Sequence, residues 1–341
     1  MNRASLFNVL VAISLLLFIP LATAIESTVE ESEFSLTDEQ VEPTAIEYLQ
    51  LMQQAYRSKN FELLYLSSLQ QQIEPMQLIH GVVDGQEVSY FRYLNGAIRE
   101  SLQFAGEISY FEQGSPAYTL KSRHNRHVFA NIANFDYQAG LDNYDYIILG
   151  KGRIAGKPSI AIRMISKDEY RYSYVIWCDL HSFLPLRLDT INHSNVVLEQ
   201  FMVVSVNVSD TINPWLVKLT ETKRPQAVHI RQQNTDKSSP WKTNWLPSGF
   251  SEVKNDQHKL AMNENDPVSY ILLDDGLVNV SIYISPKKLP LDEKQKIVRH
   301  GATLLYTEQR GNTEINVVGE IPVVTAQRLV KSVVLDQNDD N

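Results

Sequence analysis

Cysteine is nearly absent from this chain of 341 residues, which has one, Cys178. No disulfide can form within the chain, so packing alone must stabilise the fold. Cys178 stands in an alternating apolar pattern that favours a buried small hydrophobic side chain, with a reactive or intermolecular thiol as the alternative. Because Cys178 lies far from any signal junction, we also expect no lipid-modified cysteine and therefore no lipid anchor.

Long apolar runs are missing as well. The longest, residues 9–19, has 11 residues, against the roughly 20 that span a bilayer. Arg3 precedes this run and the small residues Ala22 and Ala24 follow it, which is the layout of a cleavable secretory signal. We expect residues 1–24 to be a signal peptide, with a retained anchor as the alternative. The remaining 317 residues suit two domains of roughly 100 to 200 residues each.

Positive charge is in deficit. The chain has 31 Lys and Arg against 40 Asp and Glu, a net charge of −9, and losing Arg3 with the signal makes it −10. So acidic a chain is not expected to bind nucleic acid. Seven of the acidic residues crowd residues 25–42, where apolar periodicity is lacking. This segment is predicted to be an acidic flexible tail.

Residues 43–208 are predicted to form one domain of helices and antiparallel strands. Thr44 and Glu47 make a capping box at the start of an amphipathic helix. Residues 128–137 and 141–145 are expected to form a helical turn or a loop across the concave face of the sheet. Turn pairs such as Asp84-Gly85 separate the predicted strands. These strands are residues 61–68, 76–83, 86–93, 97–104, 108–112, 146–149 and 158–165.

Residues 168–202 are rich in large aromatics and predict a three-stranded antiparallel meander. Residues 170–178 alternate with a two-residue period, and both faces carry apolar bulk. Pro185 suits the start of a second strand, and a polar turn at 192–195 precedes a third at 196–208. The aromatics first suggest a binding surface and not a catalytic centre, but we expect this meander at the edge of the sheet, with its tyrosines and Trp177 packing the two faces and the ligand-contacting residues elsewhere.

The remainder predicts a second, smaller domain. Residues 209–240 are polar and turn-rich and are read as a linker. Residues 241–335 then carry a hairpin around Asp275-Gly276, a second strand pair around Gly311, and a helix capped by Thr325. Residues 336–341 are a polar tail.

Patterns that resemble catalytic or metal sites are weak. His124 and His127 have two arginines and no carboxylate beside them, which disfavours a metal ion. Asp179, His181 and Ser182 are hydrolase residue types, but their close spacing is typical of a turn. The glycines of 150–156 lack the spacing of a phosphate loop. We therefore expect neither an enzyme nor a cofactor or metal site.

A basic loop stands out in this acidic chain. Lys121, Arg123 and Arg126 lie close together in the sequence. Guanidinium and ammonium groups bind phosphate or carboxylate groups. The three residues are candidates for binding a lipid headgroup or an acidic peptide, with an ordinary solvated loop as the alternative.

Several stretches in both halves match a known family. Those in the first half are 153–156 (RIAG), 170–172 (YRY), Trp177, Asp179, 184–186 (LPL) and 198–202 (LEQFM). Those in the second half are 246–250 (LPSGF), 275–277 (DGL), 299–303 (RHGAT), 318–322 (VGEIP) and Thr325-Ala326. On these stretches the chain resembles the RseB/MucB family, periplasmic regulators of the sigma-E envelope-stress response. Residues 61–64 and 95–97 depart from the family pattern, at the rim of the first sheet.

The resemblance implies an α+β protein with two domains. The larger N-terminal one would be a curved, unclosed antiparallel β-barrel similar to the lipoprotein carriers, with helices at its concave side. The smaller C-terminal one would be an α+β domain. Family members bind the periplasmic segment of a membrane-anchored anti-sigma factor and shield it from proteolysis, and lipid or lipopolysaccharide releases them. The resemblance thus implies negative regulation in the periplasm, without catalysis.

Two other functions stay open at this point. A periplasmic lipid or lipoprotein carrier would use the same curved sheet, although it needs no second domain. A hydrolase would rest only on scattered Ser, His and Asp residues. For the regulator, Trp245, Phe250 and Tyr270 are candidate anchors for the partner peptide, with buried core as the alternative for each. A second copy of the chain is a further candidate partner.

Overall fold

A computed structural model describes residues 42–69, 72–121, 127–226, 239–259, 267–287 and 295–335. The expected signal peptide, nearly all of the acidic tail and the polar tail at 336–341 lie outside the described residues. The described residues from 43 onward cluster as one compact unit. Within the described ranges, no helix has the length and apolar character needed to cross a membrane.

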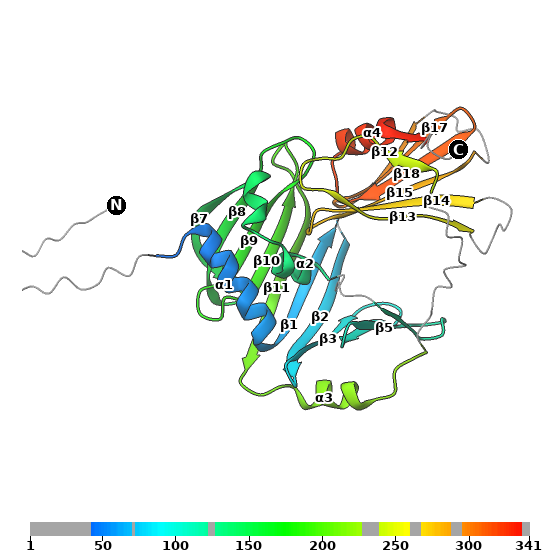
Figure 1. The fold of residues 1–341 in the computed structure, drawn as a ribbon. Coiled ribbons are helices and arrows are strands. Elements are labelled where there is room, and N and C mark those ends of the chain that lie inside the picture. The colour runs from blue at the N-terminus through cyan, green and yellow to red at the C-terminus, as the bar shows by residue number, and fades with distance from the viewer. Residues whose placement is uncertain are drawn as a thin grey trace, which may run out of the picture. The chain divides into compact units, whose positions relative to one another are not determined.

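The first domain is built on one antiparallel sheet of 11 strands, in the order β6-β5-β4-β3-β2-β1-β11-β10-β9-β8-β7. The chain places β1 to β6 outward from the middle, crosses to the far edge, and returns through β7 to β11, which pairs with β1. The sheet curves (Figure 1), and among the described residues its two end strands, β6 and β7, do not pair with each other, so the barrel is not closed. The strands are β1 (Asn60–Leu69), β2 (Gln72–Val83), β3 (Gln86–Tyr93), β4 (Arg99–Phe104), β5 (Glu107–Glu112), β6 (Tyr118–Lys121), β7 (Tyr144–Ile154), β8 (Lys157–Ser166), β9 (Ser173–Asp179), β10 (Pro185–Ile191) and β11 (Val197–Ser209).

The hairpins follow their turn residues. Asp84 and Gly85, with φ of 48° and 76°, connect β2 to β3, and Ala105 and Gly106, with φ of 51° and 74°, connect β4 to β5. Two residues with positive φ give a turn whose twist matches that of the flanking strands. The predicted unclosed antiparallel sheet is confirmed.

Two predictions about the meander need correction. Its strands β9, β10 and β11 lie inside the sheet and not at its edge, because β11 pairs with β1 along nearly its whole length. The first of them also begins at Ser173, not at residue 170. Asp168 accounts for the later start, since its Oδ1 accepts hydrogen bonds from the Tyr170 backbone N–H and the Arg171 guanidinium and so holds a turn there.

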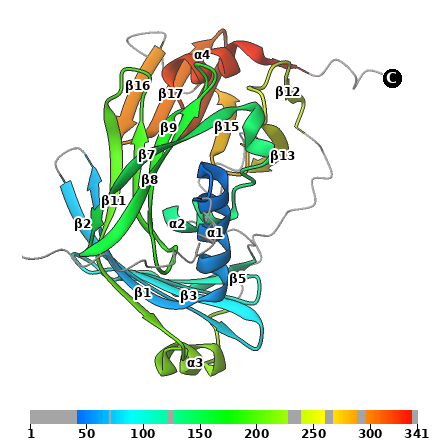
Figure 2. The same cartoon turned by 90° about the vertical axis from the view of Figure 1, so that its left-hand side faces the viewer.

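Helices fill the concave side of the sheet (Figure 2). The first, α1 (Ala45–Ser58), has the predicted capping box at Thr44 and buries one apolar stripe. Next come α2 (Val128–Asn134) and the 3-10 helix η1 (Ala139–Asp142), where a helical turn was expected. The side-chain amide of Gln53 and the guanidinium of Arg57 donate to the Ala133 carbonyl, so α1 fixes the end of α2.

The predicted linker at 209–240 is wrong over its first part. Residues 214–221 form helix α3 (Pro214–Glu221), which the Asn213 side chain caps. Leu216 is fully buried beneath it, with Ile79, Val88 and Leu102 of the sheet. The helix covers the side of the sheet opposite α1 (Figure 2) and therefore belongs to the first domain.

The second domain is a six-stranded antiparallel sheet with one helix on it (Figure 1). Its hairpin and its second strand pair confirm the predictions. Thr325 lies inside helix α4 (Val323–Ser332), whose N-cap is Pro322, so the predicted Thr325 cap is wrong. A short pair, β12 (Trp241–Thr243) with β19 (Val333–Leu335), joins the two ends of this domain. The sheet strands are β13 (Ser251–Lys259), β14 (Pro267–Asp274), β15 (Asn279–Pro286), β16 (Gln295–His300), β17 (Thr303–Arg310) and β18 (Thr313–Gly319).

Candidate functional site

A cavity of about 390 Å³ opens on the concave side of the large sheet. Strands β1 to β5, strand β11 and helix α2 supply its walls, and Glu320 reaches it from the second domain. Its volume is at the small end of the roughly 300–1,000 Å³ typical of ligand sites. Its apolar lining includes Tyr65, Met76, Phe91, Ile108 and Phe201.

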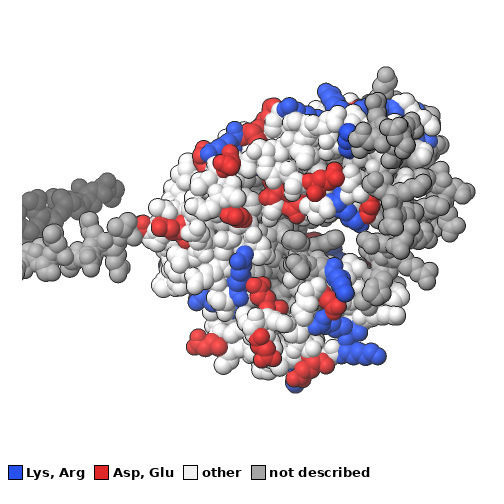
Figure 3. Space-filling model, in the orientation of Figure 1, with Lys and Arg blue, Asp and Glu red and all other residues white. Residues whose placement is uncertain are grey.

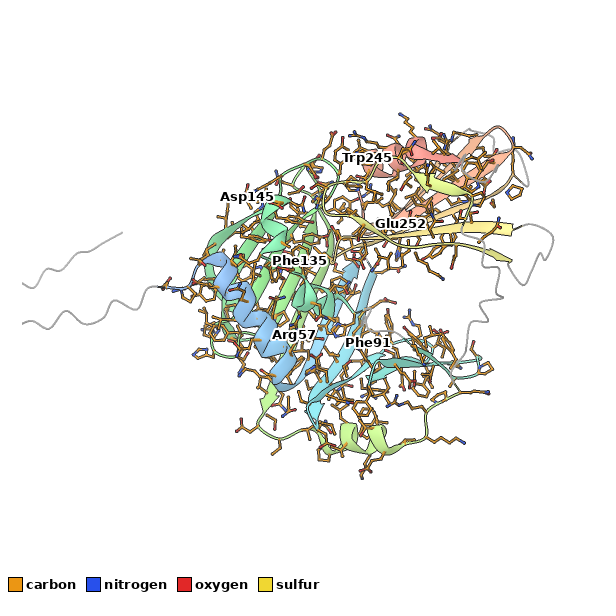
Figure 4. The ribbon with its side chains drawn as sticks, viewed as in Figure 1. Arg57, Phe91, Phe135, Asp145, Trp245 and Glu252 are labelled. Carbon is orange, nitrogen blue, oxygen red and sulfur yellow. The ribbon has the colours of Figure 1, made fainter. Side chains whose placement is uncertain are left out.

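Strand register brings these apolar side chains together. Tyr65 pairs with Met76, and Met76 pairs with Tyr93 on the next strand, so the three form a row across the sheet. Directly paired residues place their side chains on one face, within contact distance. Figure 4 labels Phe91 on the same strand as Tyr93. The aromatics of β1 and β3 therefore form the floor of the cavity.

Acidic groups dominate the charged lining. Glu100, Glu112 and Glu320 line the cavity, and Arg99 is the cation beside them among the described lining residues. The Arg99 guanidinium lies 3.6 Å from the Tyr93 ring centre and 2.9 Å from a Glu74 carboxylate oxygen, so it is already paired. Elsewhere the two signs of charge are interspersed over the face shown in Figure 3. The cavity is thus apolar with an acidic rim.

A buried polar pair adjoins this lining. Tyr56 on α1 and His127 at the start of α2 are hydrogen-bonded, Oη to Nε2, at 2.9 Å. Burial, with a smaller effect of His80, lowers the pKa of His127 to about 3. Burial also raises the pKa of the Tyr56 hydroxyl well above its ordinary value. Both side chains are therefore neutral at physiological pH.

The residues 168–172 join the two domains. Arg171, which is 3% exposed, donates to the Ser248 carbonyl and pairs with Asp168 at 3.1 Å and Asp275 at 3.8 Å. Tyr172 donates from its hydroxyl to the Ile321 carbonyl at 2.8 Å. Charged hydrogen bonds buried in this way fix geometry closely.

Three further side chains make contacts at this junction. Thr325 donates to the Tyr170 carbonyl at 2.8 Å, which explains why it does not cap α4. The Arg328 guanidinium lies 4.2 Å from the ring centre of Trp245 and 5.0 Å from that of Tyr170. Arg299 donates to the Tyr172 hydroxyl. The aromatic stretch that marks the sequence is therefore a domain junction.

The predicted lipid-binding residues are only partly described. Lys121 is exposed at the end of β6 and does not line the cavity. Arg123 and Arg126 lie outside the described residues.

The predicted partner-binding residues do not share one surface. Trp245 is half-buried at the junction (Figure 4), and Phe250 is buried there with its ring 5.9 Å from the Arg171 guanidinium. Tyr270 lies on the small sheet, 5.1 Å from the Tyr283 ring and 3.3 Å from the Ser281 hydroxyl. The structure brings Trp245 and Phe250 to the junction and leaves Tyr270 apart from them.

The catalytic and metal patterns have structural explanations. The Ser182 hydroxyl donates to Asp179 at 2.6 Å within a turn, while the His181 side chain is 78% exposed. Residues 150–154 continue strand β7. Within the described part of the chain, no group of three or more His, Cys, Asp or Glu side chains is placed to hold a metal ion.

Sequence reasoning missed the Tyr56–His127 pair and the cavity floor. Alternating aromatics in β1 and β3 were a usable pattern for the floor, since one face of each strand carries them. The pair joins residues 71 positions apart, and no local pattern connects them.

Comparison with known proteins extends these observations. The profile described as MucB/RseB N-terminal domain matches residues 44–228, and that described as MucB/RseB C-terminal domain matches residues 235–334. The chain is 31% identical to the sigma-E factor regulatory protein RseB of Salmonella typhimurium over 307 residues, covering 90% of this chain and 96% of the relative. Its identity to RseB of Escherichia coli is 32% over 291 residues, covering 85% of this chain and 91% of the relative.

Solved structures share the fold. The crystal structure of MucB in complex with MucA(peri) superposes with a TM-score of 0.68 at 22% identity, covering 86% of this chain and 99% of that chain. The two-domain architecture is therefore one that has been observed experimentally.

Proposed function

Because the chain belongs to the MucB/RseB family, we propose that it binds the periplasmic segment of a membrane-anchored anti-sigma factor and shields it from proteolysis. It would thereby act as a negative regulator of the sigma-E envelope-stress response, located in the periplasm and without enzymatic activity. The observation that carries the proposal is the match of both family domains, in order, over nearly the whole chain. Relatives with this arrangement are named as sigma-factor regulators, and one was crystallised with MucA(peri).

The second part of the proposal concerns release. A lipid or lipopolysaccharide ligand would enter the concave cavity and weaken the hold on the anti-sigma segment. Supporting this, the cavity has an apolar floor, and Glu320 of its lining precedes Ile321, whose carbonyl receives the Tyr172 hydroxyl at the domain junction. Lys121, Arg123 and Arg126 would bind the phosphates of that ligand.

For the partner segment, we propose Tyr270 as an anchor on the small sheet, with Trp245 at the rim of the junction. Trp245 already contacts Arg328 and Tyr170, so a peptide would extend this stack. Phe250 is buried and would support the surface from beneath.

A protease-protection assay tests the proposal. The mature chain that the expected signal cleavage would leave, residues 25–341, should slow cleavage of the host's own anti-sigma periplasmic segment by the protease that acts first on it. Adding lipid should restore cleavage. An unchanged cleavage rate at saturating concentrations of the mature chain contradicts the proposal.

The cavity alone also suits a periplasmic lipid or lipoprotein carrier. A carrier would need only the first domain, so transfer of lipid between vesicles should be undiminished when the substitution Tyr172→Phe removes the hydrogen bonds of the Tyr172 hydroxyl to Ile321 and Arg299 at the junction. The regulator instead requires both domains, and this substitution should weaken its response to lipid.

A further inference from the structure

The two end strands of the large sheet differ in what covers them. Outside β6, the backbone N–H and the hydroxyl of Thr119 donate to the carbonyls of Gln226 and Pro225 at 3.3 and 3.0 Å, so the residues after helix α3 cover that edge. For β7, the one strand paired with it among the described residues is β8, and residues 147–153 are all exposed. An uncovered sheet edge offers its outer backbone N–H and C=O groups to a further strand.

The first half of β7 is apolar. Ile147, Ile148 and Leu149 are 48%, 38% and 54% exposed. Proteins usually protect an exposed apolar edge from association with charged side chains or a β-bulge. In β7 both features come after the apolar residues, since the register with β8 shifts between Ile148 and Gly150 and Lys151 follows. The apolar half is therefore a surface that a partner strand can cover.

Charge indicates the kind of partner. Residues 146–167, which span most of β7 and all of β8, contain five Lys and Arg and no Asp or Glu, in a chain with a net charge of −9. Lys151 and Arg153 lie nearest the apolar half and are exposed. Asp145, at the start of β7, pairs with Lys167 at 3.2 Å. The edge is thus complementary to a segment that carries acidic residues.

A second copy of the chain fits this edge poorly. In an antiparallel pair of β7 strands, Lys151 of each copy lies opposite the apolar half of the other. The acidic Asp145 is already paired with Lys167 in each copy. The bulge beside Gly150 also interrupts the ladder in both copies. A separate extended peptide meets none of these obstacles.

We propose that β7 binds an extended acidic peptide as a twelfth strand of the sheet, antiparallel to β7. The peptide's apolar residues would lie beside residues 147–149 and its carboxylates beside Lys151 and Arg153. Because antiparallel strands run in opposite directions, such a peptide reads acidic residues first and apolar residues second. Antiparallel pairing continues the pattern of the sheet and is the more stable kind. The site goes beyond the proposed function, since none of residues 145–153 lines the cavity.

A fluorescent peptide tests the proposal. The probe has alternating Glu and Thr in its first half and alternating Val and Thr in its second, with both ends blocked. Fluorescence anisotropy would follow its binding to residues 25–341. We expect saturable binding that the double substitution Lys151→Glu, Arg153→Glu weakens about tenfold.

The matched control lies on the small sheet. Strand β16 is an end strand that exposes Ile297 and Val298 at 49% and 45% beside Lys296. The substitution Lys296→Glu should leave binding of the probe as in the wild type. No binding of the probe to the wild type, or a loss in Lys296→Glu as large as that in the double variant, overturns the proposal.

Three altered peptides separate strand pairing from attraction by charge alone. Reversing the sequence keeps the composition and places the acids beside the apolar half, so binding should weaken about tenfold. Two further peptides are N-methylated at odd or at even positions, which removes the backbone donors from one edge of the peptide. One of these two should lose binding, because one edge of an added strand faces β7. Equal binding of the reversed peptide, or of the two methylated ones, overturns the proposal.

Hydrogen exchange locates the site without any variant. The probe should slow exchange of backbone amides within residues 145–153 and leave those of β16 unchanged. Protection of other segments without protection of β7 overturns the proposal. Sedimentation of the chain alone tests the other occupant: a dimer that Ile147→Lys dissociates would place a second copy on this edge and would also overturn it.

Discussion

At the scale of single residues, we expect the buried charges at the domain junction to have the largest effect on the free energy of unfolding. Arg171 is buried between Asp168 and Asp275, and Asp275 also accepts the backbone N–H groups of Leu277 and Val278. The RseB/MucB resemblance identifies Arg171 as part of a family motif, whereas its contacts appear only in the fold. Its partners lie up to about a hundred residues away in the sequence.

We predict that Arg171→Met destabilises the protein by about 3–5 kcal/mol, because Asp275 is left buried without its cation. Urea denaturation measures this loss. Lys167→Met is the matched control, since the Lys167–Asp145 pair is exposed at 40% and 61%; it should cost less than about 1 kcal/mol. Equal effects of the two substitutions would show that burial of Arg171 is energetically unimportant.

Glu199 gives a pH-dependent prediction at the same scale. Burial, and then the neighbouring Glu320 carboxylate, raise the pKa of Glu199 to about 7 from an ordinary value of 4.5, although the Ala302 backbone N–H partly offsets this. The folded state thus holds this proton more tightly than the unfolded state. Its contribution to stability is complete below pH 4.5 and is lost as the pH rises through about 7.

The substitution Glu199→Gln removes that loss. At pH 8 the variant should be more stable than the wild type, by on the order of 1–2 kcal/mol, and at pH 4 the difference should vanish. Thermal melts across this pH range measure it. The exposed Glu252→Gln is the control and should show no such trend. A constant difference at every pH would refute the explanation.

At the scale of elements, most local signals were confirmed, the cap at Thr325 being an exception, whereas long-range strand pairing could not be predicted. The capping box at Thr44 and the hairpin turn at Asp84-Gly85 depend on neighbouring residues, and both are as predicted. The pairing of β11 with β1 joins residues about 140 apart, which no turn pattern indicates. That pairing is what moves the meander from the edge to the middle of the sheet.

Helix α3 shows a second limit of prediction from the sequence, because a single buried residue attaches it to the first domain. The segments that flank this helix are polar, and its own sequence has little periodicity. Leu216 is nevertheless fully buried against the outer face of the sheet. We predict that Leu216→Ala destabilises the first domain by about 2–4 kcal/mol. Val217→Ala on the same helix, half-buried, should cost clearly less. A flexible linker, by contrast, would tolerate both substitutions.

At the scale of the whole molecule, the cavity and the junction share neighbouring residues. Glu320 lines the cavity, and the next carbonyl, that of Ile321, receives the Tyr172 hydroxyl. A ligand that moves Glu320 therefore acts on the contact between the domains. Such coupling must be reciprocal, so a bound anti-sigma segment should weaken lipid binding by the same factor.

The difference between local and long-range contacts also explains how much of the site could be predicted from the sequence. The family motif at 170–172 and the family profile fixed the class of function, but the cavity arises from side chains on six strands, helix α2 and a residue of the second domain. Tyr56 and His127 meet only because α1 and α2 pack together. Trp245, chosen from the sequence as a candidate anchor for the partner, lies at the domain junction and does not line the cavity.

An equilibrium titration can show whether this chain binds an anti-sigma factor segment. The host's periplasmic anti-sigma segment would be titrated into residues 25–341 in a calorimeter, with a scrambled segment as control. We predict a saturable isotherm with a Kd of about 1 µM or below for the native segment and none for the scrambled one. The absence of binding at concentrations of tens of micromolar would show that the chain does not bind this segment.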